Sequence, residues 1–223
     1  MALRKPPPRH ARMRFDAVLF DLLTALLDSW TLWNHVAGSE ESGGKWRAAY
    51  LHGTYQAGRY RPYETLVAEA AREVGLPPEL AACLAARYQE LKPWPEVDEV
   101  LGTLRREGLR LGVVTNCSEE LGTAAVSCTG IEFDVVVTAE RVGYYKPDSR
   151  PYETALAELG AAASRCLFVA GSAYDLFGAR KVGLSTYWHD RIGMKSPANA
   201  PKPLAYHRTL YPLLDVLCGR AAE

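Results

Sequence analysis

Short runs of branched and aromatic residues recur along this chain, and polar residues follow each run. Runs of this length and composition are typical of buried strands. A long segment separates the first run from the second, whereas the later runs are closely spaced. The predicted strands are residues 15–20, 109–114, 133–137, 166–170 and 185–188.

The segments between the later strands have the spacing of amphipathic helices. Apolar residues in 97–104 fall on one helix face, and Gly108 follows as a stop signal. Ser118 or a neighbouring residue can cap a helix after Asn116. The other predicted helices are 151–159, which ends before Gly160, and 174–182, which ends before Gly183. This alternation predicts an α/β fold, a Rossmann-like parallel sheet with helices on both faces.

The segment 28–95 interrupts the alternation, because it contains helical patterns and no convincing strand. We therefore expect an all-helical cap domain inserted into a core formed by 15–27 and 96–223. The cap helices are predicted at 45–55, 63–74 and 80–91, and aromatic loops near 30–33 and 60–63 are expected to shape a pocket. Residues 1–14 are basic and rich in proline, and they are interpreted as a disordered tail; a start site placed too far upstream is equally compatible. Residues 195–203 are predicted as a loop before a strand or helix near 210–217.

Composition narrows the class of protein. The 223 residues are 48% hydrophobic and carry a net charge of zero, which argues against disorder and against sequence-independent binding of nucleic acid or anionic lipid. Asp21 breaks the longest apolar run, so no membrane span is expected. Five cysteines without a CxxC spacing favour reduced thiols in the cytoplasm over a disulfide framework or a zinc site.

Candidate chemistry lies just past the predicted strands, because ligands of open parallel sheets bind at the carboxyl ends of the strands. Asp21 would be costly there without a partner, and Lys146 is the obvious one. Asp175 could hold Lys146 in place. A carboxylate beside a lysine stays ionised and is a competent nucleophile. Thr115 and Asn116 could orient a second carboxylate or stabilise a leaving anion. Each residue alone could equally be a helix cap or a satisfied ion pair.

Four segments resemble, in order, the motifs of the haloacid dehalogenase superfamily. They are Phe20-Asp21, Val113-Val114-Thr115-Asn116, Tyr145-Lys146-Pro147-Asp148 and Phe168 to Asp175. Each motif alone is weak, but the ordered set is specific and spans nearly the whole chain from residue 15. The resemblance implies a Rossmann-like core, a helical cap, and an aspartate nucleophile that forms a covalent intermediate.

Within that superfamily the sequence is more similar to the L-2-haloacid dehalogenase branch than to the phosphatases. Magnesium-dependent phosphatases carry a second aspartate two residues after the first, and this chain has Leu23 there. The features shared with the dehalogenase branch are Trp46-Arg47 on the cap, Tyr152 six residues after Lys146, Tyr174-Asp175 in the fourth motif, and Trp188 with Arg191 in the tail.

The resemblance also implies roles for individual residues. Asp21 would displace halide from C2 of a small anionic substrate, and water would hydrolyse the resulting ester. Lys146 would neutralise the nucleophile, Asp175 would position Lys146, and Thr115 with main-chain donors would hold the substrate carboxylate. Arg47 and Asn116 would receive the halide. The remaining substrate-side residues would be Leu22, Tyr152, Ser172 and Tyr174. No metal or cofactor is implied, and a homodimer formed through the cap is compatible with the family.

Departures from the family pattern leave two alternatives open. Ala25 replaces a threonine, Thr24 a glycine, and Ala170 and Ser172 stand where serine and asparagine are usual. The alternatives are a magnesium-dependent phosphatase with a degenerate first motif, and a binding protein with impaired catalysis. Cys117 is expected near the pocket but not as a nucleophile. A lone loop histidine such as His189 is more often incidental.

Overall fold

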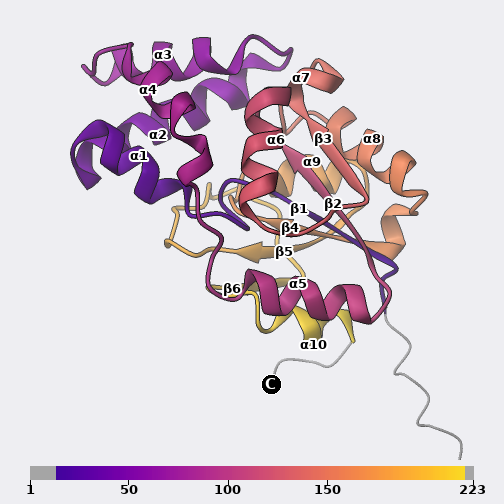
Figure 1. The fold of residues 1–223 in the computed structure, drawn as a ribbon. Coiled ribbons are helices and arrows are strands. Elements are labelled where there is room, and N and C mark those ends of the chain that lie inside the picture. Colours follow the sequence, from indigo (N-terminus) through magenta and orange to yellow (C-terminus); the bar gives the residue numbers. More distant parts are fainter. Residues whose placement is uncertain (1–13, 219–223) are drawn as a thin grey trace, which may run out of the picture.

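The computed structural model describes residues 14–218 and arranges strands from this range in one parallel sheet (Figure 1). The strand order is β3-β2-β1-β4-β5-β6: the chain runs from β1 through β2 to β3 on one side, and then crosses to β4, β5 and β6 on the other side of β1. The strands are β1 (Ala17–Phe20), β2 (Arg110–Thr115), β3 (Val135–Thr138), β4 (Cys166–Ala170), β5 (Ser185–His189) and β6 (Ala205–His207). The predicted α/β class is confirmed.

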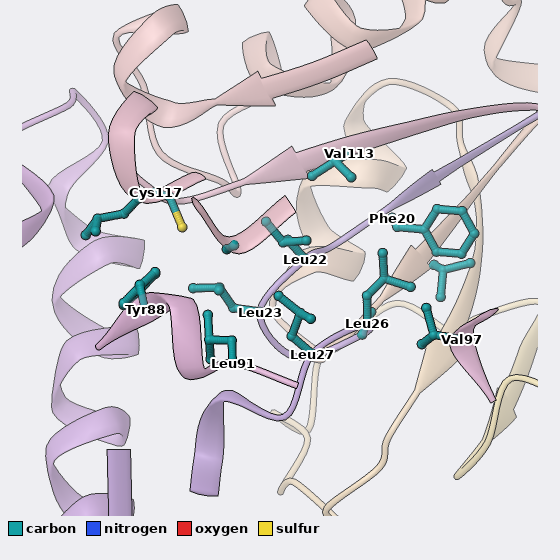
Figure 2. Close-up of a cluster of buried hydrophobic side chains, with 14 of the residues drawn as sticks. Phe20, Leu22, Leu23, Leu26, Leu27, Tyr88, Leu91, Val97, Val113 and Cys117 are labelled. Carbon is teal, nitrogen blue, oxygen red and sulfur yellow. The ribbon is translucent and has the colours of Figure 1, made fainter. Parts of the chain in front are cut away.

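Both faces of the central strands are buried, which explains why these strands are continuous apolar runs. Val18 and Phe20 of β1 join one hydrophobic cluster, whereas Ala17 and Leu19 join the other. Because successive side chains of a strand point to opposite faces, one four-residue strand contributes to both layers. Figure 2 shows part of the first cluster, in which Phe20 and Val113 meet leucines that follow β1.

Helices cover each face of the sheet. The first hydrophobic cluster draws on α5 (Val97–Arg106), α6 (Glu119–Cys128) and α10 (Leu213–Leu217). The second draws on α8 (Arg150–Leu159) and α9 (Asp175–Lys181). As expected, Ser118 caps α6 by accepting a hydrogen bond from the backbone N–H of Leu121. The short helices α7 (Ala139–Val142) and η2 (Ala163–Arg165) complete the core.

The segment between β1 and α5 is helical and lies beside the sheet as a separate layer (Figure 1). Aromatic rings hold it together, with Trp33 and Trp46 centroids 4.6 Å apart and Tyr50 and Tyr63 centroids 5.2 Å apart. Its elements are α1 (Ser29–Ala37), α2 (Glu40–Ala57), α3 (Tyr63–Glu73), α4 (Leu80–Ala86) and η1 (Tyr88–Glu90). We infer that this helical insert is the cap.

Some expectations need correction. Residues 30–33 were expected in a loop, but they belong to α1, which Asp28 caps by accepting a hydrogen bond from the backbone N–H of Thr31. The short helix α7 and the strand β6 were not predicted, because β6 has only three residues with exposed or half-buried side chains and lacks an apolar run. The segment near 210–217 forms the helix α10 rather than a strand.

The predicted tail falls outside the described residues apart from Arg14, whose backbone N–H donates to the Leu217 carbonyl. Within residues 14–218, no helix is long and apolar enough to cross a membrane.

Candidate active site

A small cavity of about 30 Å³ lies between the helical insert and the carboxyl ends of the central strands. Asp21 follows β1, which lies next to β4; the connections from these two strands run to opposite sides of the sheet, and open sheets form a crevice at such a point. The cavity is lined by Asp21, Leu23, Thr24, Arg47, Tyr50, Leu51, Tyr55, Thr115, Asn116, Lys146, Ser172 and Asp175. Residues from five separate parts of the chain therefore meet at one edge of the sheet.

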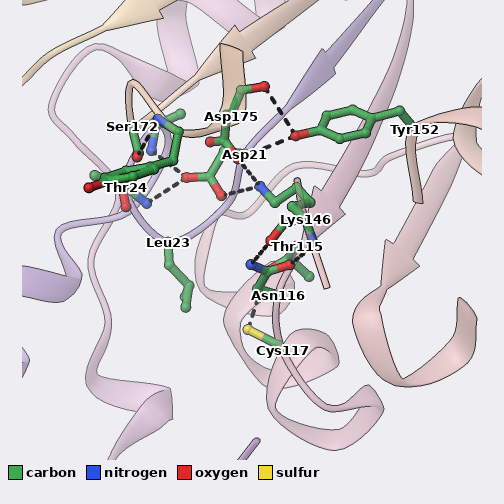
Figure 3. A network of polar contacts seen from close by, with 12 residues as sticks. Asp21, Leu23, Thr24, Thr115, Asn116, Cys117, Lys146, Tyr152, Ser172 and Asp175 are labelled. Atoms are coloured by element: carbon green, nitrogen blue, oxygen red, sulfur yellow. Dashed lines mark hydrogen bonds and ion pairs between the residues drawn. The ribbon is translucent and has the colours of Figure 1, made fainter. Parts of the chain in front are cut away.

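Lys146 lies between two buried carboxylates (Figure 3). Its Nζ is 2.8 Å from Asp21 Oδ1 and 3.1 Å from Asp175 Oδ1, and the Lys146 side chain is 2% exposed. Burial raises the pKa of Asp175 to about 6, with the charge of Lys146 opposing this shift. Burial also pushes the pKa of Asp21 upward, but Lys146 and two backbone amides outweigh it and hold the pKa below its ordinary value. Asp21 is therefore ionised at neutral pH.

Asp21 Oδ2 is held by the chain that follows it. The backbone N–H groups of Thr24 and Ala25 donate to this oxygen at 3.1 and 3.2 Å. Gly171 packs against the same group, because a Cβ at this position would lie 2.6 Å from Asp21 Oδ2 and 2.5 Å from the Thr24 Cβ. A side chain at 171 would therefore displace the carboxylate.

Asn116 holds the loop that carries Lys146. Its Oδ1 accepts from the Lys146 backbone N–H at 2.7 Å, and its Nδ2 donates to the Lys146 carbonyl at 3.2 Å. This paired contact fixes the amide of Asn116 beside the cavity. The insert is also tied to the segment after β2, because the Tyr50 hydroxyl donates to the Asn116 carbonyl at 3.3 Å.

Arg47 brings a buried positive charge to the cavity from α2. It is 1% exposed, and its Nη2 donates to Thr24 Oγ1 at 3.1 Å. Its guanidinium lies over the rings of Trp30 at 4.6 Å and Trp33 at 5.4 Å. Among the described residues, Nε and Nη1 have no hydrogen-bond partner. Buried donors of this kind are costly unless an anion or water satisfies them, so they mark this side of the cavity as an anion site.

The structure brings most predicted site residues to the cavity, but not all of them. Thr115 and Ser172 line it, although the Thr115 hydroxyl donates to Cys117 Sγ at 3.2 Å. Leu22, Tyr152 and Tyr174 do not line it. Leu22 is fully buried among core side chains, because it follows the strand directly and points into the cluster of Figure 2.

Tyr152 and Tyr174 act on neighbours of the cavity instead. The Tyr152 hydroxyl donates to the Asp175 backbone carbonyl at 3.3 Å and to Asp175 Oδ1 at 3.4 Å. The Tyr174 ring stacks on Tyr55 with centroids 4.2 Å apart. Both tyrosines therefore contact residues that line the cavity.

Sequence analysis missed the aromatic contribution of α2. Arg47, Leu51 and Tyr55 line the cavity from positions four residues apart on one helix face, together with Tyr50. The Tyr55 hydroxyl is 3.0 Å from Ser172 Oγ and joins the insert to the fourth motif. The spacing of four residues from Arg47 was the signal that could have found Leu51 and Tyr55. The expected pocket walls at 30–33 and 60–63 do not line the cavity.

Cys117 was expected near the pocket, and it is buried below it rather than lining it. Burial raises the pKa of Cys117 to about 12, so it is a neutral thiol at neutral pH.

The carboxylates do not suit a magnesium ion. The phosphatase alternative would need oxygen ligands around Asp21, but Leu23 occupies the neighbouring position and the Lys146 ammonium already bridges Asp21 and Asp175. No group of three or more histidine, cysteine or acidic side chains within residues 14–218 is arranged to hold a metal ion.

The buried Asp21 at the carboxyl end of a parallel α/β sheet, paired with Lys146, is typical of a hydrolase with an aspartate nucleophile. Comparison with known proteins identifies the family. The family of haloacid dehalogenase-like hydrolases matches residues 18–189. The (S)-2-haloacid dehalogenase of Pseudomonas sp. strain YL is 40% identical over 112 residues, and this match spans 49% of the chain and 48% of that enzyme. Haloacetate dehalogenase H-2 of Moraxella sp. strain B is 28% identical over 81% of the chain and 88% of its own length.

The fold agrees with solved structures of the same group. A crystal structure of an L-2-haloacid dehalogenase superposes with a TM-score of 0.80 and 28% identity, covering 91% of this chain and 98% of the other. The chain belongs to the family of haloacid dehalogenase-like hydrolases, and it is a hydrolase enzyme.

Proposed function

We propose that this hydrolase releases halide from small (S)-2-haloacids by way of an ester on Asp21, without a metal ion. The observation that carries the proposal is the buried Lys146 ammonium placed between Asp21 and Asp175. It keeps the nucleophile ionised, and Leu23 stands where a phosphatase of this superfamily carries its second aspartate. The relatives named for (S)-2-haloacids and for haloacetate support this substrate class.

The proposed reaction has two steps. A carboxylate oxygen of Asp21 attacks C2 of the haloacid, and the carbon–halogen bond breaks with both electrons leaving on the halide. Water then attacks the carbonyl carbon of the ester, which returns the Asp21 carboxylate and releases the 2-hydroxyacid and one proton. Halide is a weak base and needs hydrogen-bond donors rather than an acid, so no second aspartate is required at position 23.

Arg47 is the donor best placed for the anionic parts of this reaction. Its Nε and Nη1 lack partners among the described residues, and the stacked Trp30 and Trp33 rings hold the guanidinium in place. Asn116 lines the same cavity, but its amide is already bound to the Lys146 backbone. We therefore assign halide capture first to Arg47; Thr115 and Ser172 also line the cavity.

A chelator experiment separates this proposal from the phosphatase alternative. We expect halide release from (S)-2-chloropropionate or chloroacetate at the same rate with magnesium and with EDTA, because the proposed steps use only side chains. Halide release would be followed by ion chromatography, and a phosphate ester screen would run in parallel. Magnesium-dependent phosphate release without halide release would contradict the proposal.

The rate of halide release should fall as the pH drops below about 6. Because burial raises the pKa of Asp175 to about 6, Asp175 takes up a proton in that range and loses its hold on Lys146. A profile of kcat/KM against pH should show one acid limb there. Tyr152→Phe removes a donor that stabilises the Asp175 carboxylate, so its limb should move to higher pH. A flat profile from pH 5 to 8 would contradict this assignment.

We also propose a location and an assembly for this protein. Buried and half-buried free thiols such as Cys117 and Cys128 favour a reducing cytoplasmic setting. A homodimer formed through the helical insert is compatible with the family, and light scattering of the purified protein would test it.

A further inference from the structure

The nucleophile loop, residues 22–27, decides how Asp21 is oriented. Its leucines anchor it in the hydrophobic cluster of Figure 2. The backbone N–H groups of Thr24 and Ala25 in this loop donate hydrogen bonds to Asp21 Oδ2. Residue 25 is an alanine, so it offers no hydroxyl to this oxygen. The direction of the carboxylate therefore depends on the backbone conformation of the loop.

Successive carbonyl groups of the nucleophile loop are held by separate donors. The Leu22 carbonyl accepts from backbone N–H groups within the loop, and the Leu26 carbonyl accepts from the Trp94 backbone N–H at 3.0 Å. The two residues whose amides hold Asp21 use remote side chains instead. Trp94 Nε1 donates to the Thr24 carbonyl at 3.0 Å, and His189 Nδ1 lies 2.8 Å from the Ala25 carbonyl.

His189 is suited to act as a fixed donor. It ends β5 and is fully buried, and burial lowers its pKa, so the ring is neutral at neutral pH. A carbonyl can only accept, so the proton is on Nδ1. The charged groups that face the ring are Glu96, whose Oε1 is 3.8 Å from Nε2, and Arg191, which binds that same oxygen at 2.9 Å. The Arg208 backbone lies close to the ring as well.

The two donors belong to one network. The Arg191 guanidinium lies 4.9 Å from the centroid of the Trp94 ring, and Arg191 also binds Glu96. Glu96 in turn accepts from the Leu210 backbone N–H at 3.2 Å. His189 and Trp94 are therefore held by shared partners behind the nucleophile loop, on the side away from the cavity, whose lining includes neither of them.

We infer that His189 and Trp94 are positioning residues, which fix the nucleophile loop so that the amides of Thr24 and Ala25 aim at Asp21 Oδ2. The inference rests on the proposed dehalogenation for its kinetic consequence. Small displacements of a nucleophile are costly in rate, because in-line attack needs the reacting atoms aligned. Neither residue touches the substrate, so their loss should lower kcat and leave substrate binding nearly unchanged.

Three variants test the inference. His189→Leu removes the donor, and His189→Asn keeps a donor close to the position of Nδ1. Trp94→Phe removes the indole N–H together with part of the ring that faces Arg191. We expect kcat for halide release to fall about 10- to 100-fold in His189→Leu, with KM changed less than about threefold. His189→Asn should recover most of kcat, and Trp94→Phe should fall by a smaller factor.

A matched variant controls for lost stability. Leu159→Ala opens the second hydrophobic cluster, on the other face of the sheet from the nucleophile loop, and it should destabilise the fold without lowering kcat at a temperature where the protein is folded. Wild-type kcat in His189→Leu, or an equal loss in His189→Asn and His189→Leu, would overturn the inference.

A second measurement does not depend on activity. Hydrogen exchange at the Thr24 and Ala25 amides should be faster in His189→Leu by about tenfold relative to amides of β1 and β4, and unchanged relative to them in Leu159→Ala. If the wild-type protein releases no halide from any haloacid, the proposed function fails and exchange still decides the positioning role. Unchanged exchange in His189→Leu would overturn that role.

Discussion

Asp21→Asn is expected to abolish halide release, with a fall in kcat of about 10⁴-fold or more, because the variant lacks the nucleophile. The side chain keeps its shape, so the fold and the backbone contacts at Oδ2 should persist in altered form. The buried Lys146 would keep Asp175 as its partner, at 3.1 Å. Binding of a haloacid, measured by calorimetry, should therefore survive the loss of turnover. This result would separate the nucleophile from the residues that bind substrate.

Heavy-oxygen water provides a direct test of the ester intermediate. In a single turnover of the wild-type protein, water attacks the Asp21 ester carbonyl, so one labelled oxygen should appear in the peptide that contains Asp21. Mass spectrometry would locate the label. The matched control is Asp134→Asn, which changes a carboxylate near the start of β2, at the end of the strand opposite to the cavity, where it binds Arg105 and the Leu111 backbone N–H. It should retain turnover and labelling. Label found only in the released hydroxyacid would contradict the covalent mechanism.

Lys146→Met is expected to lower both the rate of halide release and the free energy of unfolding. It leaves Asp21 and Asp175 buried together without the cation that neutralises them. Removing one partner from such a buried cluster typically lowers the free energy of unfolding by about 3–5 kcal/mol. The pKa values of both carboxylates should rise, so the nucleophile is partly protonated, and kcat/KM should fall about 100- to 1,000-fold or more.

The stability of Lys146→Met should depend on pH in a direction that can be measured. In Lys146→Met the carboxylates have folded-state pKa values above their unfolded values, so each proton taken up relieves repulsion and desolvation. The loss of stability relative to wild type should therefore be larger at pH 7 than at pH 5. Chemical denaturation at the two pH values measures it. Lys45→Met, which changes an exposed lysine paired with Glu41, is the control and should alter neither stability nor turnover. A larger loss at pH 5 would refute the explanation.

Much of the fold could be predicted from the sequence, because its signals are local. Apolar runs predicted the strands that the structure shows between Ala17 and His189, and β4 matches the predicted range 166–170. The cluster of Asp21, Lys146 and Asp175 could also be predicted, since the carboxyl ends of parallel strands meet at one edge of a sheet. The family resemblance added Arg47, which no local pattern distinguishes from a solvated basic helix.

Other parts of the site depend on side-chain directions that no short pattern encodes. Leu22 follows Asp21 in the chain, and Tyr152 lies six residues after Lys146 as in the family pattern, yet neither lines the cavity. His189 looked incidental in sequence, but it donates to the Ala25 carbonyl, which lies more than half the chain away. Trp94 reaches the Thr24 carbonyl in the same way.

The sequence by itself determined the α/β class, the helical insertion, and the acid and base residues that a hydrolase of this family would use. Only the tertiary structure decided that the Asn116 amide binds the Lys146 backbone, that the Tyr55 hydroxyl contacts Ser172, and that backbone amides orient the nucleophile. The physical reason is that periodicity and strand ends are local properties of the chain. Hydrogen-bond partners, in contrast, are set when remote segments pack together, because each buried donor and acceptor then needs a hydrogen-bond partner.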